Sequence, residues 1–532
     1  MSITSCFDDK GNYDYTVLNE IYVDTTGVQT TFTRSQFDSL VITPDIRFTE
    51  ATIDNANLEF KWVLYSDKFV NEASATEKLT TERDLKMVVT QQPQPDPYAI
   101  MLYITDKQNN TVYQTKYSLT VIASVISGWV VLHTGSDGSD LDYIATTNSV
   151  PGLETNRRMR NVYSSMNGVK IGGNPLFVST VRINTTIVDN VYVGTDSEFL
   201  LLSGKDFSLQ HKNEEMFKNP VSRILPQFVG HGGRYGVHHS TLLINDGKVH
   251  CINNQASPYW IYAFSNALPN SSSLKGEVSV APYVYFSEQP SSFVNNAGAF
   301  YDTVGKRFVR LPYSYWEEEP LLPFAEQLPT ARFDVNNIGK DLMYFDNGYE
   351  AEGFALFTDG ASRELYRIKF NTITFLDFEH VNEENPEIHN LARTIYDMSA
   401  LPEIYDARFY ASGTRGYYFY YATERNIYAF SYAGSKQAVL VNDPFPEDEK
   451  ITNLKIYNTG IWSALRDVSG TIMYVSTWNG KEGKLYEFAI NTSSGAFYNL
   501  NEINGVVNRK APLNVFDNFG KIVDMSVKIE GY

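Results

Sequence analysis

A strand, a tight turn and a second strand recur seven times between residues 129 and 488, and this repeat limits the possible folds more than any other feature. Each copy joins two short apolar runs through Gly, Asp, Asn or a similar turn residue, as β-hairpins do. The turns follow one another at steps of 58, 51, 58, 55, 65 and 55 residues. The predicted hairpins join 129–132 to 141–144, 191–193 to 199–202, 242–244 to 249–252, 299–301 to 308–311, 354–357 to 365–368, 418–421 to 427–430 and 472–475 to 485–488.

This repeat predicts a seven-bladed β-propeller over residues 128–532. The step exceeds the roughly 40–50 residues of a compact blade, but it fits a four-stranded blade with one long loop. An open solenoid is the main alternative. Segments 404–407 and 451–454 precede the sixth and seventh hairpins as inner strands would, and a similar segment, 522–525, has no hairpin after it. The first hairpin has no such strand before it, so we expect the C-terminal strand to complete the first blade and close the ring.

The part of the chain before the repeat alternates with period two, which predicts strands rather than helices. Segment 58–65 places Leu58, Phe60, Trp62 and Leu64 on one face, as a sandwich strand with one buried face requires. Segments 100–104 and 117–121 repeat the alternation around a turn at 106–110, which predicts an antiparallel pair. We therefore predict an all-β chain with a leading segment at 1–27, an Ig-like β-sandwich at 28–123 and the propeller at 128–532.

Charge and cysteine content exclude several classes of protein. With 44 Lys and Arg against 62 Asp and Glu the net charge is −18, so no basic surface for nucleic acid is expected. The only cysteines, Cys6 and Cys251, are too few for a disulfide scaffold or a cysteine-based zinc site. Cys251 lies in an apolar strand, where we interpret it as a small core residue. Cys6 ends a lipobox-like segment, 3–6, and an acidic stretch follows it; these residues alone fit a lipidated cysteine and an ordinary chain terminus equally well.

Three features together resemble the PKD-like lipoproteins of Bacteroidetes: Cys6 with its acidic tether, the sandwich segment ending at 117–121, and the entry into the repeats at 128–132. The glycine- and aspartate-rich signature of standard PKD domains is missing around Trp62, so only the sandwich pattern carries over. In that family such proteins are commonly encoded beside SusC/SusD-like outer-membrane importers. The resemblance implies lipidation at Cys6, a surface-exposed place at the outer membrane held by the lipid anchor alone, and partnership with such an importer.

The sequence shows none of the motifs that would predict a reaction. It has no nucleophile elbow, phosphate-binding loop, zincin helix or calcium loop. The histidine-rich segment 231–239 contains no acidic residue, and we interpret it as a glycine-rich loop rather than a metal site. The run 317–319 of three glutamates is interpreted as a solvated loop rather than a catalytic acid. We therefore predict no catalytic residue, no metal, no cofactor and no enzymatic activity.

Aromatic loops on a propeller face are the best candidates for ligand contact, because exposed rings stack on sugars and on peptide side chains. Two such loops, 257–262 and 312–316, follow the third and fourth hairpins, and an alternative for both is packing between adjacent blades, whereas Trp478 is predicted in the turn of the seventh hairpin. The candidate ligand-binding residues are Tyr259, Trp260, Tyr313, Tyr315, Trp316 and Trp478. These features favour a surface lipoprotein that binds an oligosaccharide or a peptide and hands it to an importer. A propeller hydrolase or lyase acting on glycan or peptide, and a purely structural importer subunit, are the alternatives.

Overall fold

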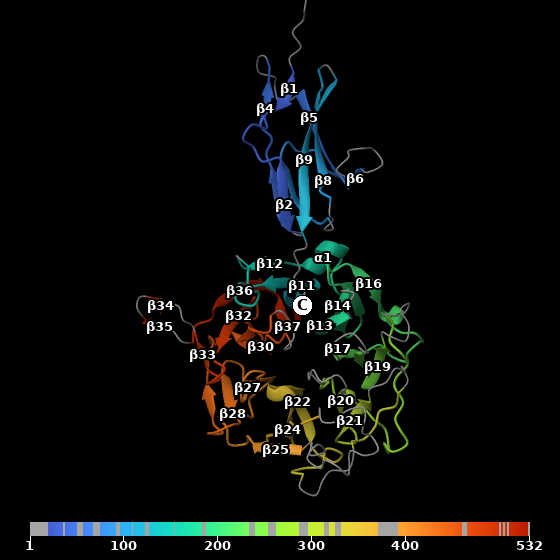
Figure 1. The fold of residues 1–532 in the computed structure, drawn as a ribbon, viewed down its shortest axis with the longest axis vertical. Coiled ribbons are helices and arrows are strands. Elements are labelled where there is room, and N and C mark those ends of the chain that lie inside the picture. The colour runs from blue at the N-terminus through green and yellow to red at the C-terminus, as the bar shows by residue number, and fades with distance from the viewer. Residues whose placement is uncertain are drawn as a thin grey trace, which may run out of the picture. The chain divides into compact units, whose positions relative to one another are not determined.

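The computed structural model describes residues 20–35, 38–49, 57–66, 75–91, 96–108, 110–122, 127–153, 155–183, 188–232, 240–253, 262–286, 296–312, 319–324, 331–370, 392–459, 465–498, 502–503, 506–507 and 510–529. The chain divides into two units, Met1–Ser124 and Val125–Tyr532, each with hydrophobic clusters of its own. Both units are built almost entirely from antiparallel strands (Figure 1). The all-β class predicted from the sequence is confirmed.

The first unit is a β-sandwich. Its strands are β1 (Ile21–Val23), β2 (Thr31–Ser35), β3 (Ser39–Ile42), β4 (Ile46–Phe48), β5 (Leu58–Tyr65), β6 (Ala75–Thr80), β7 (Leu85–Val88), β8 (Tyr98–Asp106) and β9 (Thr111–Ile122). One sheet has the order β2-β9-β8-β5-β6, and the pairs β3-β7 and β1-β4 form separate two-stranded sheets. β2 runs parallel to β9, whereas the predicted pair β8-β9 is antiparallel as expected. β1 lies within residues 1–27, so the predicted leading segment contributes a strand of its own.

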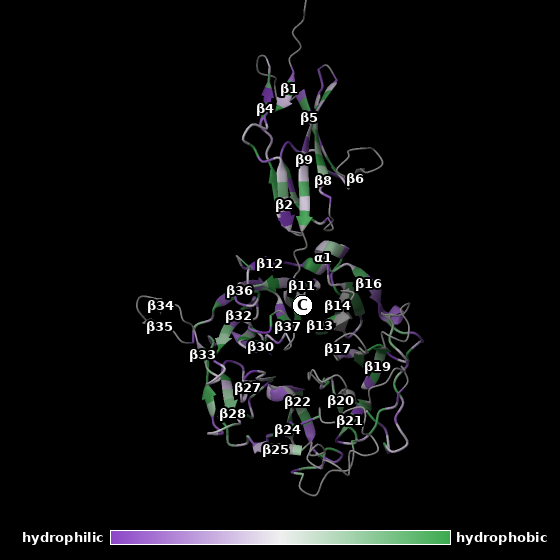
Figure 2. Ribbon diagram, in the orientation of Figure 1, coloured by the Kyte–Doolittle hydropathy of each residue, from purple (hydrophilic) through white to green (hydrophobic). Residues whose placement is uncertain are grey.

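The alternating pattern that predicted these strands fills the core of the sandwich. Trp62 on β5 is fully buried against Tyr117 on β9, with ring centroids 5.7 Å apart, and its indole Nε1 donates to the Glu82 carbonyl at 3.1 Å. Leu40 and Leu85 of the pair β3-β7 pack into the same cluster. Alternating hydrophobic and polar bands are visible along β9 in Figure 2. Burial of the face that carries these residues therefore holds the two layers together.

The second unit is a ring of sheets around a central axis (Figure 1). Its first three sheets contain β12 (Arg157–Met159), β11 (Gly138–Ala145), β10 (Gly128–Gly135) and β37 (Lys521–Lys528); β13 (Pro175–Ile183), β14 (Val188–Thr195), β15 (Phe199–Ser203) and β16 (Leu209–Lys212); and β17 (Pro226–Gly232), β18 (Ser240–Asn245) and β19 (Lys248–Asn253). The fourth and fifth contain β20 (Asn296–Asp302) and β21 (Arg307–Pro312); and β22 (Asp341–Asn347), β23 (Gly353–Thr358), β24 (Glu364–Ile368) and β25 (Ala392–Asp397).

The last two sheets of the ring contain β26 (Phe409–Ser412), β27 (Tyr418–Ala422), β28 (Ile427–Ser431) and β29 (Ala438–Leu440); and β30 (Lys450–Ile456), β31 (Ile472–Trp478), β32 (Gly483–Ile490), β33 (Phe497–Tyr498) and β36 (Asn514–Phe519). A further hairpin is made by β34 (Glu502–Ile503) and β35 (Val506–Val507). Helices are short: α1 (Val162–Asn167), η3 (Asn213–Met216) and η4 (Tyr349–Ala351). The described residues of the ring thus form seven successive sheets beside that hairpin.

All seven predicted hairpins are confirmed as antiparallel pairs in these sheets. Buried side chains of neighbouring sheets form the cores between them. One such cluster joins Phe308 of the fourth sheet to Phe345 and Phe357 of the fifth. The propeller is therefore held together by apolar packing between radial sheets.

The C-terminal strand closes the ring as predicted. β37 pairs with β10, and Trp129 faces Val527 across this pair while it faces Ile144 across the pair β10-β11. A side chain at Gly520, where the chain enters β37, would stand 1.9 Å from the Thr134 carbonyl oxygen, so only glycine fits there. The first sheet thus contains both ends of the propeller segment, and the prediction of closure by the last strand is correct.

One predicted inner strand is wrong. Segment 404–407 forms turns, and the inner strand of the sixth sheet is β26, which begins at Phe409. Ile404 and Ala407 are both buried, while Tyr405 between them is exposed. This spacing of three between buried residues fits turns joined by the hydrogen bonds from Ile404 N to Leu401 O and from Ala407 N to Ile404 O. The other predicted inner strand, 451–454, lies in β30.

Candidate functional site

A cavity of about 480 Å³ lies between the third, fourth and fifth sheets of the propeller. It is open to solvent and lies where the inner strands begin and where the hairpin turns of the sheets gather. We call it the channel-mouth cavity. It is lined by Gln227, Asp246, Gly247, Ser279, Val280, Ala281, Pro282, Tyr283, Thr303, Leu342 and Met343.

Sharp turns bring these segments together. The turn between β18 and β19 has Gly247 at φ +69°, a left-handed conformation that favours glycine. Gly247 N donates to Gln227 Oε1 at 2.7 Å, and its carbonyl accepts from Val280 N of the next sheet at 2.9 Å. A Cβ at this glycine would stand 2.3 Å from Ser279 Oγ. The Asp-Gly pair found in the sequence is therefore needed to bring the third and fourth sheets together at the cavity.

Hydrogen bonds fix the polar wall of the cavity. Thr303 donates to the Ser279 carbonyl through its backbone N at 2.7 Å and through Oγ1 at 2.9 Å. The buried carboxylate of Asp302 accepts from Ser279 N at 3.2 Å and from Arg307 Nε at 3.1 Å. Asp246 forms an exposed ion pair with Arg223. The polar wall is thus held in place before any ligand arrives, which lowers the cost of binding.

The rest of the lining includes apolar and aromatic side chains. Leu342 and Met343 come from the start of β22, and Tyr283 comes from the segment before β20. Tyr283 Oη donates to the Met343 carbonyl at 3.3 Å, and its ring lies 5.9 Å from that of Tyr344 at 68°. Burial raises the pKa of Tyr283, and the nearby Asp346 carboxylate raises it further. Half-buried apolar and aromatic groups beside a few fixed polar groups are the usual lining of a small-molecule site.

Charged side chains continue along the inner strands around the central axis. Lys455 on β30 pairs with Asp524 on β37, with Nζ 2.5 Å from Oδ1, and donates to the Met525 carbonyl at 2.6 Å. Asp524 Oδ2 also accepts from Val178 N on β13 at 3.1 Å. These contacts connect the first, second and seventh sheets at the inner edge of the ring. β13, β30 and β37 are therefore joined at the inner edge of the ring by an ion pair and by hydrogen bonds to the backbone.

Of the predicted ligand-binding residues, the structure describes only Trp478. It is half-buried and is the last residue of β31, where it pairs with Lys450 and Gly483, so it is part of a strand and not of the turn. It lies in the seventh sheet, outside the lining of the channel-mouth cavity. Tyr259, Trp260, Tyr313, Tyr315 and Trp316 lie outside the described residues, as does Cys6. Their roles remain predictions.

Sequence reasoning missed the cavity residues. Ser279, Tyr283, Leu342 and Met343 belong to inner strands or to the segments that precede the predicted hairpins. A usable signal was the alternation in 281–285, where Tyr283 and Tyr285 share a face just before the fourth hairpin. The structure places this segment beside β20 through an isolated bridge between Tyr285 and Ala299, and the pattern does not show which side chains reach the cavity.

Several other features singled out in the sequence lie wholly or partly within the described residues. Cys251 is a buried free cysteine in the core, as predicted. The His231 side chain contacts Thr241, with Nδ1 3.1 Å from Oγ1. The rest of the histidine-rich segment from 233 to 239, and most of the glutamate run 317–319, lie outside the described residues. No described group of three or more His, Cys, Asp or Glu side chains is placed to hold a metal ion. Within the same residues no helix has the length and apolar character to cross a membrane.

Comparison with known families gives one match. Residues 6–175 match the PKD-like family, a stretch that begins at Cys6, runs through the sandwich and β10 to β12 of the first propeller sheet, and ends at the first residue of β13. No curated protein sequence matches the chain.

Several solved structures are similar to the chain at low identity. A quinonprotein alcohol dehydrogenase-like protein from Bacteroides thetaiotaomicron is 12% identical, with 94% of this chain and 99% of that one covered and a TM-score of 0.43. The Cps50 β-propeller domain from Myceliophteria thermophila is 13% identical over 64% of this chain and 89% of that one, with a TM-score of 0.34. A DUF4784 family protein from Bacteroides caccae is 9% identical over 80% and 95%, with a TM-score of 0.29. At this level of identity, the similarity does not assign the activity of any of these proteins to this chain. The strands and the family match identify an all-β protein in which a PKD-like N-terminal part precedes a β-propeller.

Proposed function

We propose that this protein is a surface lipoprotein that binds a short oligosaccharide or peptide at the channel-mouth cavity and hands it to a SusC/SusD-like outer-membrane importer. In this proposal Cys6 carries the lipid anchor, the sandwich is a spacer, and the propeller is the binding part. The protein carries out no reaction on its cargo.

The channel-mouth cavity is the observation that supports binding most directly. Its volume of about 480 Å³ falls in the range of roughly 300–1,000 Å³ that small-molecule sites occupy. Its lining combines Thr303, held by hydrogen bonds to the Ser279 carbonyl, with the side chains of Tyr283 and Leu342. A cavity of this size and mixed lining accommodates a few sugar rings or amino-acid residues, and it offers both apolar contacts and hydrogen bonds.

A binding experiment on the full-length protein tests the site. We expect isothermal titration calorimetry with oligosaccharide and peptide libraries to find a ligand whose affinity falls at least tenfold, or about 1.4 kcal/mol, in Thr303→Trp. Thr303 is exposed in the turn after β20, so an indole there fills the cavity without entering the core. Val304→Trp is the matched control, because Val304 is 58% exposed and does not line the cavity. Unchanged affinity in Thr303→Trp, or cleavage of the ligand during the titration, would contradict the proposal.

The anchor and the partner need a separate experiment in the native host. The support is the resemblance of Cys6 and its tether to lipoproteins and the PKD-like match that starts at that cysteine. We expect the full-length precursor to partition into the outer membrane and Cys6→Ala to leave it. We also expect an importer complex to co-purify with the native protein. Membrane partitioning that survives Cys6→Ala would exclude lipidation at this cysteine.

A further inference from the structure

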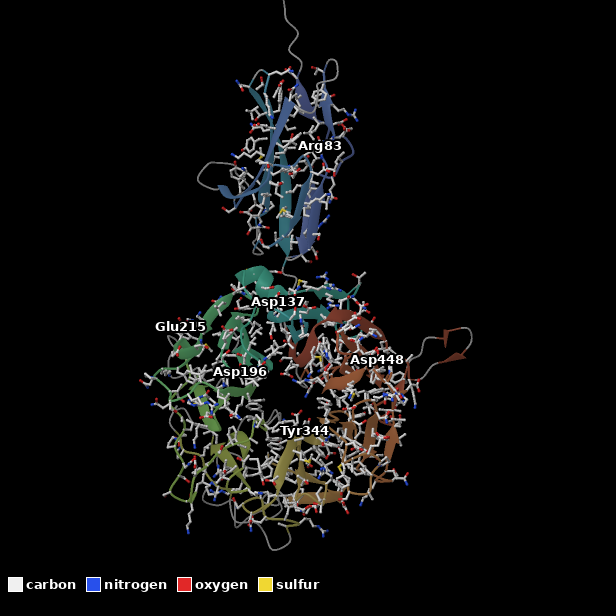
Figure 3. The ribbon with its side chains drawn as sticks, turned by 180° about the vertical axis from the view of Figure 1, so that it is seen from behind. Arg83, Asp137, Asp196, Glu215, Tyr344 and Asp448 are labelled. Atoms are coloured by element: carbon white, nitrogen blue, oxygen red, sulfur yellow. The ribbon has the colours of Figure 1, made fainter. Side chains whose placement is uncertain are left out.

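Asp346 is a carboxylate at the inner edge of the propeller that has no charged partner among the described residues. It lies on β22, the inner strand of the fifth sheet, two residues after Tyr344, which Figure 3 shows at the inner rim of the ring. Its side chain is exposed, so solvent and ligands reach it. Oδ2 accepts from Tyr344 Oη at 3.0 Å, and Oδ1 accepts from Asn347 N at 2.7 Å. No Lys or Arg among the described residues forms an ion pair with it.

The cation that acts on the Asp346 carboxylate, Lys455, is already paired with another carboxylate. Lys455 lowers the pKa of Asp346 from a distance, but its own ammonium is bound to Asp524 and to the Met525 carbonyl. Desolvation by the protein around it is the stronger influence and raises the pKa of Asp346 above the usual value for an aspartate. Because the side chain is exposed and Lys455 is paired elsewhere, a cation brought by a ligand pairs with Asp346 without displacing an existing ion pair.

Two aromatic rings connect this carboxylate to the channel-mouth cavity. Tyr283 lines the cavity, its ring is 5.9 Å from that of Tyr344, and Tyr344 holds Asp346 through its hydroxyl. Tyr344 is itself fixed by Ser412 N, which donates to Oη at 3.2 Å. A cation beside the rings gains from their electron-rich faces as well as from the carboxylate.

Each Asp346 oxygen already accepts one hydrogen bond, which leaves one lone pair on each oxygen for a ligand. A bidentate guanidinium would need both of these lone pairs at once, in one plane. A primary ammonium needs only one remaining lone pair. A metal ion is disfavoured, since Asp346 belongs to no described group of three metal-binding side chains.

We propose that Asp346, together with the rings of Tyr283 and Tyr344, binds the primary ammonium group of the cargo. This inference rests on the proposed function and narrows its cargo to oligomers with a free amine. Two sources supply that chemistry: a peptide, through its N-terminus or a lysine, and an oligosaccharide of deacetylated amino sugars.

Titration calorimetry of the full-length protein with four probes separates these sources. The probes are the tetrapeptide Ala-Lys-Ala-Ala, the same peptide acetylated on both amines, a glucosamine tetramer and an N-acetylglucosamine tetramer. We expect at least one free-amine probe to bind tenfold or more tightly than its acetylated partner, and the pair that shows this preference identifies the source. In Asp346→Asn the preference should vanish. In Tyr283→Leu, which keeps the carboxylate, it should fall about two- to fivefold.

A second aspartate on the same strand provides the matched control. Asp341 is 66% exposed and is already paired with Lys306 at 2.7 Å, so Asp341→Asn should keep the full preference. Circular dichroism and a thermal melt verify that Asp346→Asn is folded, and Tyr283→Leu tests the site independently if it is not.

Each result decides the inference. Equal affinity for free and acetylated probes, or a preference that survives in Asp346→Asn, overturns it. If Thr303→Trp abolishes binding while Asp346→Asn keeps the preference for free-amine probes, the proposed function is supported and the ammonium site is excluded. If no probe binds the wild-type protein, the ammonium site falls, and the libraries tested against Thr303→Trp decide the proposed function alone.

Discussion

At the scale of single residues, the propeller is joined between its last and first sheets by one buried carboxylate. Glu487 on β32 is fully buried and accepts from Thr146 Oγ1 at 2.6 Å, from Tyr474 Oη at 2.7 Å and from Asn148 Nδ2 at 3.2 Å. Asn514 also donates to it. Four donors for one carboxylate offset the cost of burying its charge. Burial, followed by the charge of Glu487, raises the pKa of Tyr474 well above its usual value, so Tyr474 remains a donor.

We predict that Glu487→Gln lowers the free energy of unfolding of the propeller by about 2–3 kcal/mol, because the amide nitrogen then faces donors and leaves them unsatisfied. Urea unfolding followed by circular dichroism measures the change. Glu424→Gln is the control: Glu424 is 63% exposed and paired with an equally exposed Lys450, so its change should stay within about 0.5 kcal/mol. Similar values for the two variants would show that the Glu487 network does not stabilise ring closure.

A second residue-scale prediction concerns acid stability. Burial, the largest single influence on Asp142, favours its neutral form, but hydrogen bonds from His133 and Asn161 and the charge of Arg158 together hold its pKa below the usual 3.8. A depressed native pKa means that this contribution is complete above pH 3.8 and is lost as the pH falls through the lower native value. We expect Asp142→Asn to cost about 2 kcal/mol at pH 7 and progressively less below pH 3.8. Urea unfolding of both proteins at several pH values tests this, and a difference that does not change with pH would contradict it.

At the scale of elements, the hairpins were predictable and several inner strands were not. A hairpin is a local structure whose turn residues and apolar runs lie within about a dozen residues, so the sequence pattern contains most of its determinants. The inner strand of the sixth sheet shows the limit: 404–407 has the right composition, but its buried residues are three apart and form turns. Trp478 likewise follows the strand period to the end of β31, although its neighbours Asn479 and Gly480 predict a turn.

β37 is the element whose loss should have the largest effect on the ring. It provides the inner strand of the first sheet. Asp524 on this strand forms an ion pair with Lys455 of the seventh sheet and accepts a hydrogen bond from Val178 N of the second sheet. We predict that a chain ending at Gly520 loses cooperative unfolding of the propeller and becomes sensitive to trypsin, because the buried side chains of Ile522 and Met525 leave the core. Thermal melts and limited proteolysis measure both effects.

Two comparisons make the truncation result specific. A chain ending at Ile529 keeps all of β37 and should behave as the wild type. A synthetic peptide of residues 521–529, added to the chain that ends at Gly520, should restore part of the protease resistance. If the chain lacking β37 unfolds as cooperatively as the full chain, closure by this strand does not stabilise the propeller.

At the scale of the whole molecule, the candidate site comes from segments that lie far apart in the sequence. Gln227, Ser279 and Met343 meet only because three sheets converge on the axis. Asp346 is one of 62 acidic residues, and nothing in its local sequence distinguishes it from the solvated ones. Sequence reasoning therefore predicted the architecture and the closure of the ring, whereas the selection of site residues required the geometry of the assembled propeller.

The division into two units leads to a prediction about the stability of the full chain. Leu102 is fully buried in the sandwich core, and Leu485 is fully buried in the core between the seventh and first sheets of the propeller. Removing three carbons from either core should cost about 2–5 kcal/mol. We expect Leu102→Ala to lower only the sandwich transition in a calorimetric melt and Leu485→Ala to lower only the propeller transition. Tryptophan fluorescence assigns each transition, because Trp62 lies in the sandwich and Trp129 in the propeller. A single transition that shifts in both variants would show that the two units unfold as one body, and the sandwich could not then be described as an independent spacer.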